Sequence, residues 1–134
     1  IWGDDLVCDD GMVAYFRQTN ENILIVPQCE TVAALESIEQ IAQMHGVDGI
    51  MVGPFDLSVA LGKPGELEDR EVVAAIARVL AACQKFGKQS YIFAGSTAKA
   101  KDYRDQGFTS IVVGLDILVL KAAYTDFIKE IKGN

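Results

Sequence analysis

Two acidic residues follow apolar runs of the chain, at positions where paired carboxylates could bind a cation. Glu30 comes shortly after the run 23–27, and Asp56 follows the run 50–52. The carboxyl ends of parallel strands share one edge of a sheet, where functional side chains gather. Neighbouring strands are about 4.8 Å apart, so we expect the two carboxylates to converge on one ion. Their hard oxygen ligands favour Mg²⁺ or Mn²⁺, with Co²⁺ as an alternative.

The sequence Gly-Pro-Phe-Asp-Leu-Ser at 53–58 predicts a turn that leads into a short helix, 57–61. Gly53 lets the backbone approach a ligand closely, and the N–H groups at a helix start can hold a carboxylate. A cation beside such a carboxylate-binding helix start suits a 2-oxo acid. The ketone oxygen and one carboxylate oxygen of the acid would chelate the ion, and the N–H groups would hold the other carboxylate oxygen. The ion would then stabilise the enolate as a Lewis acid.

Each of these residues also has a plainer interpretation. Glu30 could complement the dipole of the following helix, and Asp56 could be a helix N-cap. Their joint occurrence with Gln28 and the Gly-Pro turn favours a metal site. The single histidine, His45, is expected at a helix C-terminus, far from the carboxyl ends of the strands. Cys29 is expected in the core, on the strand face opposite Gln28 and Glu30.

Three further segments are interpreted as surface. The sequence Gly-Lys-Pro-Gly at 62–65 predicts a surface turn, with a lid over the site as the alternative. Lys99 and Lys101 are expected on the solvated surface of a helix. Trp2 and the acidic pairs that precede residue 11 are expected in a solvated terminus.

Apolar runs alternate with segments of helical periodicity along nearly the whole chain. Gly46, Gly87 and Gly107 each come just after a predicted helix, where a left-handed residue ends the helix. This repeating pattern predicts βα units whose strands are parallel and end on the same side. The predicted strands are 23–27, 50–52, 91–93 and 111–113, and the predicted helices are 12–19, 31–44, 71–86, 97–106 and 116–132.

Four such units make about half of a (β/α)8 barrel, which needs about 250 residues. The chain has 134 residues, so we predict an α/β fold in a single domain, 1–134. Residues 1–20 would form an upstream helix and terminus, and 21–134 the four units; a small open sheet is the alternative. Because both outer strands would have unpaired edges, we expect a complementary half-barrel or further copies of the chain. The first residue is Ile1, which suggests a processed or cut piece.

The composition excludes several classes of partner. The net charge of −7 argues against a nucleic acid partner and against an anionic membrane surface. We find no apolar run of the length that a membrane span needs and no signal peptide. The three cysteines, Cys8, Cys29 and Cys83, are widely spaced, which suggests a reducing, cytoplasmic compartment.

Two motifs together resemble a known family. Gln-x-Glu-Thr at 28–31, followed by Val-Asp-Gly-Ile-x-Val-Gly-Pro-x-Asp-Leu-Ser at 47–58, resembles the metal-dependent pyruvate aldolases of the HpcH/HpaI family. The resemblance runs from about Tyr15 to the strand 111–113. It implies a multimeric lyase with a barrel of the phosphoenolpyruvate/pyruvate type. Such enzymes reversibly cleave 4-hydroxy-2-oxo acids or 2-keto-3-deoxy sugar acids to pyruvate and an aldehyde.

The resemblance also implies roles for individual residues. Glu30 and Asp56 would ligate the metal, and the N–H groups of Phe55 and Asp56 would hold the pyruvate carboxylate. Phe93 would lie near the aldehyde, and Gln28 would line the pocket. The substrate-binding residues that it implies are Gln28, Gly53, Pro54, Phe55, Asp56 and Phe93.

This sequence departs from the family pattern in two ways. The four earlier strands of the family barrel carry a His–Asp pair for proton transfer and an Arg that polarises the carbonyl, and none of these is present. No catalytic residue is therefore identified in this chain. The family sequence Val-Gly-Ser-Asp-Thr-Gly also becomes more apolar here, with Leu115 and Ile117. The alternative to an aldolase is a catalytically incomplete half-barrel that acts as a binding or assembly subunit.

Overall fold

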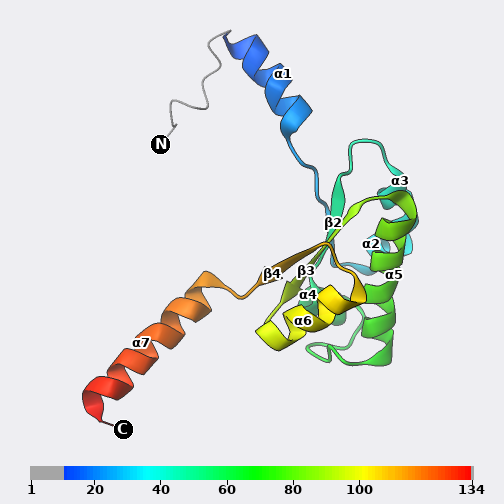
Figure 1. Ribbon diagram of the computed structural model, residues 1–134. Coiled ribbons are helices and arrows are strands. Elements are labelled where there is room, and N and C mark those ends of the chain that lie inside the picture. Colours follow the sequence, from blue (N-terminus) through cyan, green and yellow to red (C-terminus); the bar gives the residue numbers. More distant parts are fainter. Residues whose placement is uncertain (1–10, 134) are drawn as a thin grey trace.

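The fold alternates strands and helices, and a computed structural model describes it for residues 11–133 (Figure 1). The expectation for Trp2 and its acidic neighbours lies outside the described residues. In chain order the elements are α1 (Met12–Asn22), β1 (Gln28–Cys29), α2 (Val32–Glu36), α3 (Ile38–Gln43), β2 (Gly49–Val52), α4 (Pro54–Ala60), α5 (Arg70–Phe86), β3 (Gln89–Ala94), α6 (Thr97–Gln106), β4 (Ser110–Val113) and α7 (Asp116–Lys132).

The described strands form one parallel sheet in the order β1-β2-β3-β4. Each strand therefore pairs with its neighbour along the chain, and Met51 lies opposite both Gln28 and Tyr91. β1 and β4 are the edges of the sheet. The predicted α/β class, with parallel βα units and two open edges, is confirmed.

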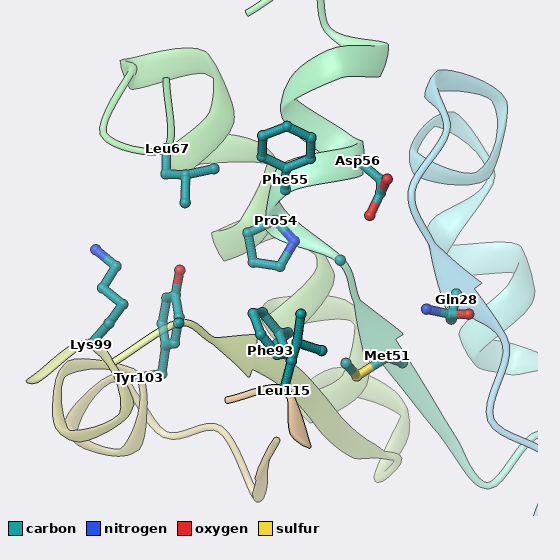
Figure 2. Close-up of a pocket in the computed structure, with 12 residues that line it drawn as sticks. Gln28, Met51, Pro54, Phe55, Asp56, Leu67, Phe93, Lys99, Tyr103 and Leu115 are labelled. Carbon is teal, nitrogen blue, oxygen red and sulfur yellow. The ribbon is translucent and has the colours of Figure 1, made fainter. Parts of the chain in front are cut away.

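One face of the sheet packs against helices and forms the core. Ile50, Val52 and Ile92 point to this face and are at most 1 % exposed, and they belong to one core cluster with Val72 and Val79 of α5. The residues between them along the strands point to the opposite face, where Met51 and Phe93 are only half-buried and line a pocket (Figure 2). The strand alternation thus separates core residues from pocket residues.

Polar side chains cap the starts of α5 and α6, and glycines end both helices. Asp69 accepts a hydrogen bond from Glu71 N at the start of α5, and Ser96 accepts one from Lys99 N at the start of α6. Gly87 and Gly107 then end these helices in the left-handed region, with φ of 65° and 103°. Both glycine positions were predicted correctly, because a side chain would strain this conformation.

The strand at 23–27 and the helix at 31–44 were predicted with the wrong bounds. The segment 23–27 is not a regular strand, and β1 begins only at Gln28, although the carbonyls of Ile25 and Pro27 still accept hydrogen bonds from Asp48 N and Met51 N. Pro27 has no N–H group to donate to a ladder, which shortens the regular pairing. The helix predicted at 31–44 is divided at Ser37 into α2 and α3.

α1 and α7 extend away from the body of the molecule (Figure 1). Neither helix has a buried residue, and large apolar side chains on α7, including Ile117, Phe127 and Ile131, are more than half exposed. Among the described residues, no helix is long and apolar enough to span a membrane. A helix with many exposed apolar side chains and no buried residue is typical of a surface that meets another segment.

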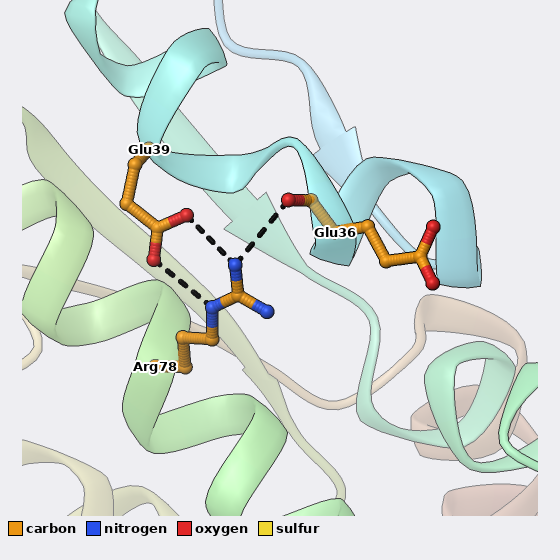
Figure 3. A network of polar contacts seen from close by, with 3 residues as sticks. All are labelled: Glu36, Glu39 and Arg78. Carbon is orange, nitrogen blue, oxygen red and sulfur yellow. Dashed lines mark hydrogen bonds and ion pairs between the residues drawn. The ribbon is translucent and has the colours of Figure 1, made fainter.

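Arg78 connects α5 to α3 on the outside of the helical layer. Its guanidinium donates hydrogen bonds of 2.9 and 2.8 Å to the two carboxylate oxygens of Glu39, and one of 3.3 Å to the carbonyl of Glu36 (Figure 3). The bidentate bond from Arg78 lowers the pKa of Glu39 from 4.5 to about 2.

This pair is expected to give a small acid sensitivity to folding. Because the pKa of Glu39 is lowered in the folded state, its contribution is complete above pH 4.5 and is lost as the pH falls towards about 2. Thermal unfolding of the wild type and of Glu39→Gln should therefore differ near neutral pH and converge across this interval. Glu36→Gln is the control, because Arg78 binds only the backbone carbonyl of Glu36. A constant difference down to pH 2 would contradict the assignment.

Candidate functional site

An open pocket of about 520 Å³ lies at the carboxyl ends of the strands (Figure 2). It contains all six residues that the sequence predicted for substrate binding. The residues that line it are Gln28, Met51, Gly53, Pro54, Phe55, Asp56, Leu67, Phe93, Gly95, Lys99, Tyr103 and Leu115. Glu30 is not part of this lining and lies at the edge of the site.

Glu30 and Asp56 meet at Gly53. A Cβ atom on Gly53 would lie 3.2 Å from Oε2 of Glu30 and 3.3 Å from Oδ2 of Asp56, so both oxygens border a space that glycine leaves open. Two carboxylate oxygens beside such a space are a suitable partial ligand set for a hard divalent cation. The described residues contain no group of three or more His, Cys, Asp or Glu side chains that could hold a metal ion. Waters or substrate oxygens would have to complete the set.

The local backbone explains how these carboxylates reach the site. α4 begins at Pro54, three residues earlier than predicted, with Gly53 in the N-cap position. Asp56 therefore lies in the first turn and is not an N-cap, so that interpretation was wrong. Glu30 directly precedes Thr31, the residue that caps α2 by accepting a hydrogen bond from Ala34 N. Proline in the first turn presets the backbone for the helix.

Ser58 fixes α4 to the segment that follows it, and the sequence alone did not predict this role. Its buried hydroxyl donates to the carbonyl of Phe55 at 2.6 Å and accepts from Gly65 N at 2.9 Å. The segment 62–65 is thus a turn anchored on α4. Leu67, shortly after this turn, forms part of the pocket wall.

Lys99 was wrongly assigned to ordinary helix surface. Its side chain lines the pocket, its Nζ lies 2.6 Å from Oε1 of Glu68, and the ammonium lies 5.3 Å from the ring centroid of Tyr103. The hydrogen bond to Glu68 raises the pKa of Lys99, so this side chain is a cation. Lys101 is exposed, as predicted. The four-residue spacing of Lys99 and Tyr103 on α6 was the only signal in the sequence.

The remaining candidates have structural roles. Cys29 is 1 % exposed within the core, and burial raises the pKa of its thiol to about 11, which disfavours the nucleophilic thiolate. Burial also raises the pKa of Cys83. His45 is exposed just after α3, outside the pocket lining.

The family model described as HpcH/HpaI aldolase/citrate lyase matches residues 11–123. The chain belongs to this family. Among curated relatives, it is 42 % identical over 109 residues to a 5-keto-4-deoxy-D-glucarate aldolase from Klebsiella pneumoniae, covering 81 % of this chain and 43 % of that protein. A hydroxypyruvate/pyruvate aldolase from Paraburkholderia phytofirmans is 36 % identical over 88 % of this chain and 45 % of its own length.

Two solved structures share the fold of this chain. A family protein from Burkholderia cenocepacia superposes with a TM-score of 0.82 at 36 % identity, over 88 % of this chain and 46 % of that one. Macrophomate synthase gives a TM-score of 0.76 at 25 % identity, over 96 % of this chain and 44 % of its own. The chain thus spans less than half the length of these relatives, and its four βα units correspond to about half of their fold.

In this HpcH/HpaI chain, Gly53 provides a specific test of the carboxylate pair. We expect Gly53→Ala to weaken Mn²⁺ binding about tenfold, because the new Cβ would press on both carboxylate oxygens. The backbone itself tolerates alanine, since φ is −96° and ψ is 92°. Calorimetric titration with Mn²⁺ measures the effect.

Gly95→Ala is the matched control for this measurement. Gly95 lines the same pocket, but a Cβ there would have no atom within 4 Å. Its Mn²⁺ affinity should equal that of the wild type. Equal losses in the two variants would show that Gly53 does not act through Glu30 and Asp56.

Proposed function

We propose that the chain is the metal-binding and pyruvate-binding C-terminal half of an aldolase barrel. The reaction would be reversible cleavage of a 4-hydroxy-2-oxo acid or a 2-keto-3-deoxy sugar acid to pyruvate and an aldehyde. The observation that carries the proposal is the convergence of Glu30 and Asp56 on Gly53 at the edge of a pocket. Relatives named 5-keto-4-deoxy-D-glucarate aldolase and hydroxypyruvate/pyruvate aldolase support it.

The residues fit a divalent cation, either Mg²⁺ or Mn²⁺. Glu30 and Asp56 would supply two oxygen ligands, and the space at Gly53 leaves room beside them. When bound, the cation supplies Lewis-acid chemistry to a 2-oxo group. The half-buried phenyl ring of Phe93 gives the pocket an apolar wall that limits water.

Other residues would orient the substrate. The N–H groups of Phe55 and Asp56, in the first turn of α4, would donate to the carboxylate of pyruvate. Gln28 lies on the neighbouring strand, and its amide group points into the pocket (Figure 2). Its amide can donate to or accept from oxygens of the bound acid.

The proton-transfer groups must come from elsewhere. Among the described residues that line the pocket there is no histidine, and Lys99 is protonated and engaged with Glu68. A general base must lie within hydrogen-bond reach of the proton it removes. We propose that a complementary half-barrel supplies the base, together with the carbonyl-polarising Arg that the family resemblance implies.

Pyruvate release from 4-hydroxy-2-oxo acids tests this function. The chain is assayed with its complementary half, with Mn²⁺ and after EDTA treatment. We expect release that requires Mn²⁺, is abolished by EDTA and returns when Mn²⁺ is added back. Release that is unaffected by EDTA would overturn the metal-dependent mechanism.

A second candidate function is a binding or assembly subunit without catalysis. The open edges β1 and β4, together with the exposed apolar side chains of α7, favour this alternative. Native mass spectrometry separates the two functions. A complex that contains a second polypeptide completing the barrel favours the aldolase, whereas multiples of the 14.5 kDa chain alone favour assembly.

A further inference from the structure

A second, smaller cavity adjoins the proposed substrate pocket. Its volume is about 80 Å³, and its lining residues are Leu67, Glu68, Val73, Ile76, Lys99, Tyr103 and Gln106. Leu67, Lys99 and Tyr103 line both spaces, so their side chains form a partition between the pocket and the smaller cavity. A water molecule occupies about 30 Å³ in the liquid, so the smaller cavity has room for a short extension of a ligand.

The partition lies at the end of the pocket remote from the proposed cation site. Figure 2 shows Asp56 on one side of Phe55 and the three partition residues on the other. A 2-oxo acid bound beside Asp56 would therefore direct its tail, the carbon chain beyond the 2-oxo group, towards the partition.

The chain on both sides of Leu67 is held in place. Two residues before it, the N–H group of Gly65 donates to the buried hydroxyl of Ser58 at 2.9 Å. Directly after it, Glu68 lies 2.6 Å from Nζ of Lys99 on α6. Leu67 N also donates to the carbonyl of Gly65 at 3.0 Å. A fixed turn therefore presents this half-buried leucine to the pocket.

The other two partition residues are fixed by each other and by their neighbours. Tyr103 is 3 % exposed and packs edge-on against Phe108. The ammonium of Lys99 lies 5.3 Å from the ring centroid of Tyr103, and a cation over an aromatic face is attracted by the ring. Leu67 takes no part in these contacts, so its side chain can be shortened while they remain.

We infer that Leu67 is a specificity-determining residue that limits the length of the substrate tail. This inference rests on the proposed function, because Asp56 and the turn beside it must hold the 2-oxo acid end. Each methylene group that a tail buries strengthens binding by up to about fourfold. A tail that is too long for the pocket must displace a fixed side chain, so the affinity falls beyond that length.

Calorimetric titration of the Mn²⁺-loaded full chain with unbranched 2-oxo acids tests the inference. The probes are pyruvate, 2-oxobutanoate, 2-oxopentanoate, 2-oxohexanoate, 2-oxooctanoate and 2-oxodecanoate. We expect the affinity of the wild type to rise with tail length and then to fall about tenfold once the tail meets the partition. Leu67→Ala should move this fall to acids about two carbons longer, because their tails can enter the smaller cavity.

Leu61→Ala is the matched control for the loss of a leucine side chain. Leu61 is also half-buried between α4 and α5, but it packs against the core and lines neither space. This variant should keep the wild-type length limit. An equal shift in Leu61→Ala and Leu67→Ala would show that a loosened segment, and not the partition, admits the longer tails, and the inference would be overturned.

A second substitution tests whether the longer tails enter the smaller cavity. Val73 of α5 lines that cavity but not the pocket, and it is 46 % exposed, so a larger side chain can be placed there. Val73→Phe alone should keep the wild-type limit, and combined with Leu67→Ala it should restore that limit. A double variant that still accepts the longer acids would contradict the role given to Leu67.

The pyruvate titration separates the inference from the proposed function. If pyruvate binds but the affinities show no length limit, or if Leu67→Ala keeps the wild-type limit, the role of Leu67 is overturned while the 2-oxo acid site stands. If pyruvate itself does not bind to the Mn²⁺-loaded chain, the proposed function fails, and the role of Leu67 fails with it.

Discussion

Asp56→Asn is expected to weaken Mn²⁺ binding by about a hundredfold or more. The carboxylate is one of the two that meet at Gly53, and a neutral amide is a poor ligand for a hard divalent cation. Glu30→Gln removes the other carboxylate and should have the same effect. Calorimetric titration with Mn²⁺ measures both losses.

The control for these variants is Asp102→Asn, on the exposed surface of α6. It makes the same change of charge away from the pocket and should bind Mn²⁺ as the wild type does. Urea unfolding should place Asp56→Asn within about 1 kcal/mol of the wild type, because the substitution loses only a favourable contact with the helix dipole. Wild-type heats of Mn²⁺ binding in Asp56→Asn and Glu30→Gln would refute the metal site.

Leu57→Ala is expected to lower the free energy of unfolding by about 3 kcal/mol. Leu57 is 0 % exposed and belongs to the core cluster, so the substitution leaves a cavity. It directly follows Asp56 on α4, and a loosened helix should also weaken Mn²⁺ binding. Urea unfolding measures the stability, and titration at a temperature where the variant is folded measures the affinity.

Val59→Ala controls for the change of side-chain size on the same helix. Val59 is 50 % exposed, so its truncation should change the free energy of unfolding by less than about 0.5 kcal/mol. Comparable losses in the two variants would show that α4 is not anchored through Leu57.

The fold could be predicted because the strands alternate between two environments and the helices end at glycines. Ile92 and Phe93 are adjacent, yet one lies in the core and the other in the pocket, as a period of two requires. The division at Ser37 was missed because the apolar spacing continues across it. Periodicity reports which face is buried, and it is a weak guide to where a helix breaks.

Within the site, features set by the strand topology were predictable, and features set by irregular segments were not. Gln28 and Asp56 lie where strand ends must lie, so the topology alone brings them together. The position of Lys99 depends on Glu68, which comes from a segment 31 residues earlier that has no regular pattern. Likewise, the bond between Ser58 and Gly65 depends on the path of a turn, and composition cannot specify that path.

Because strand order follows chain order, folding can proceed as a sequence of short loop closures. Each new strand has to find only the one that precedes it, so the entropy lost in closing each loop stays small. The first of these closures, which pairs β1 with β2, already brings Glu30 towards Asp56. Both carboxylates of the proposed cation site therefore belong to elements that precede β3 and β4 in the chain.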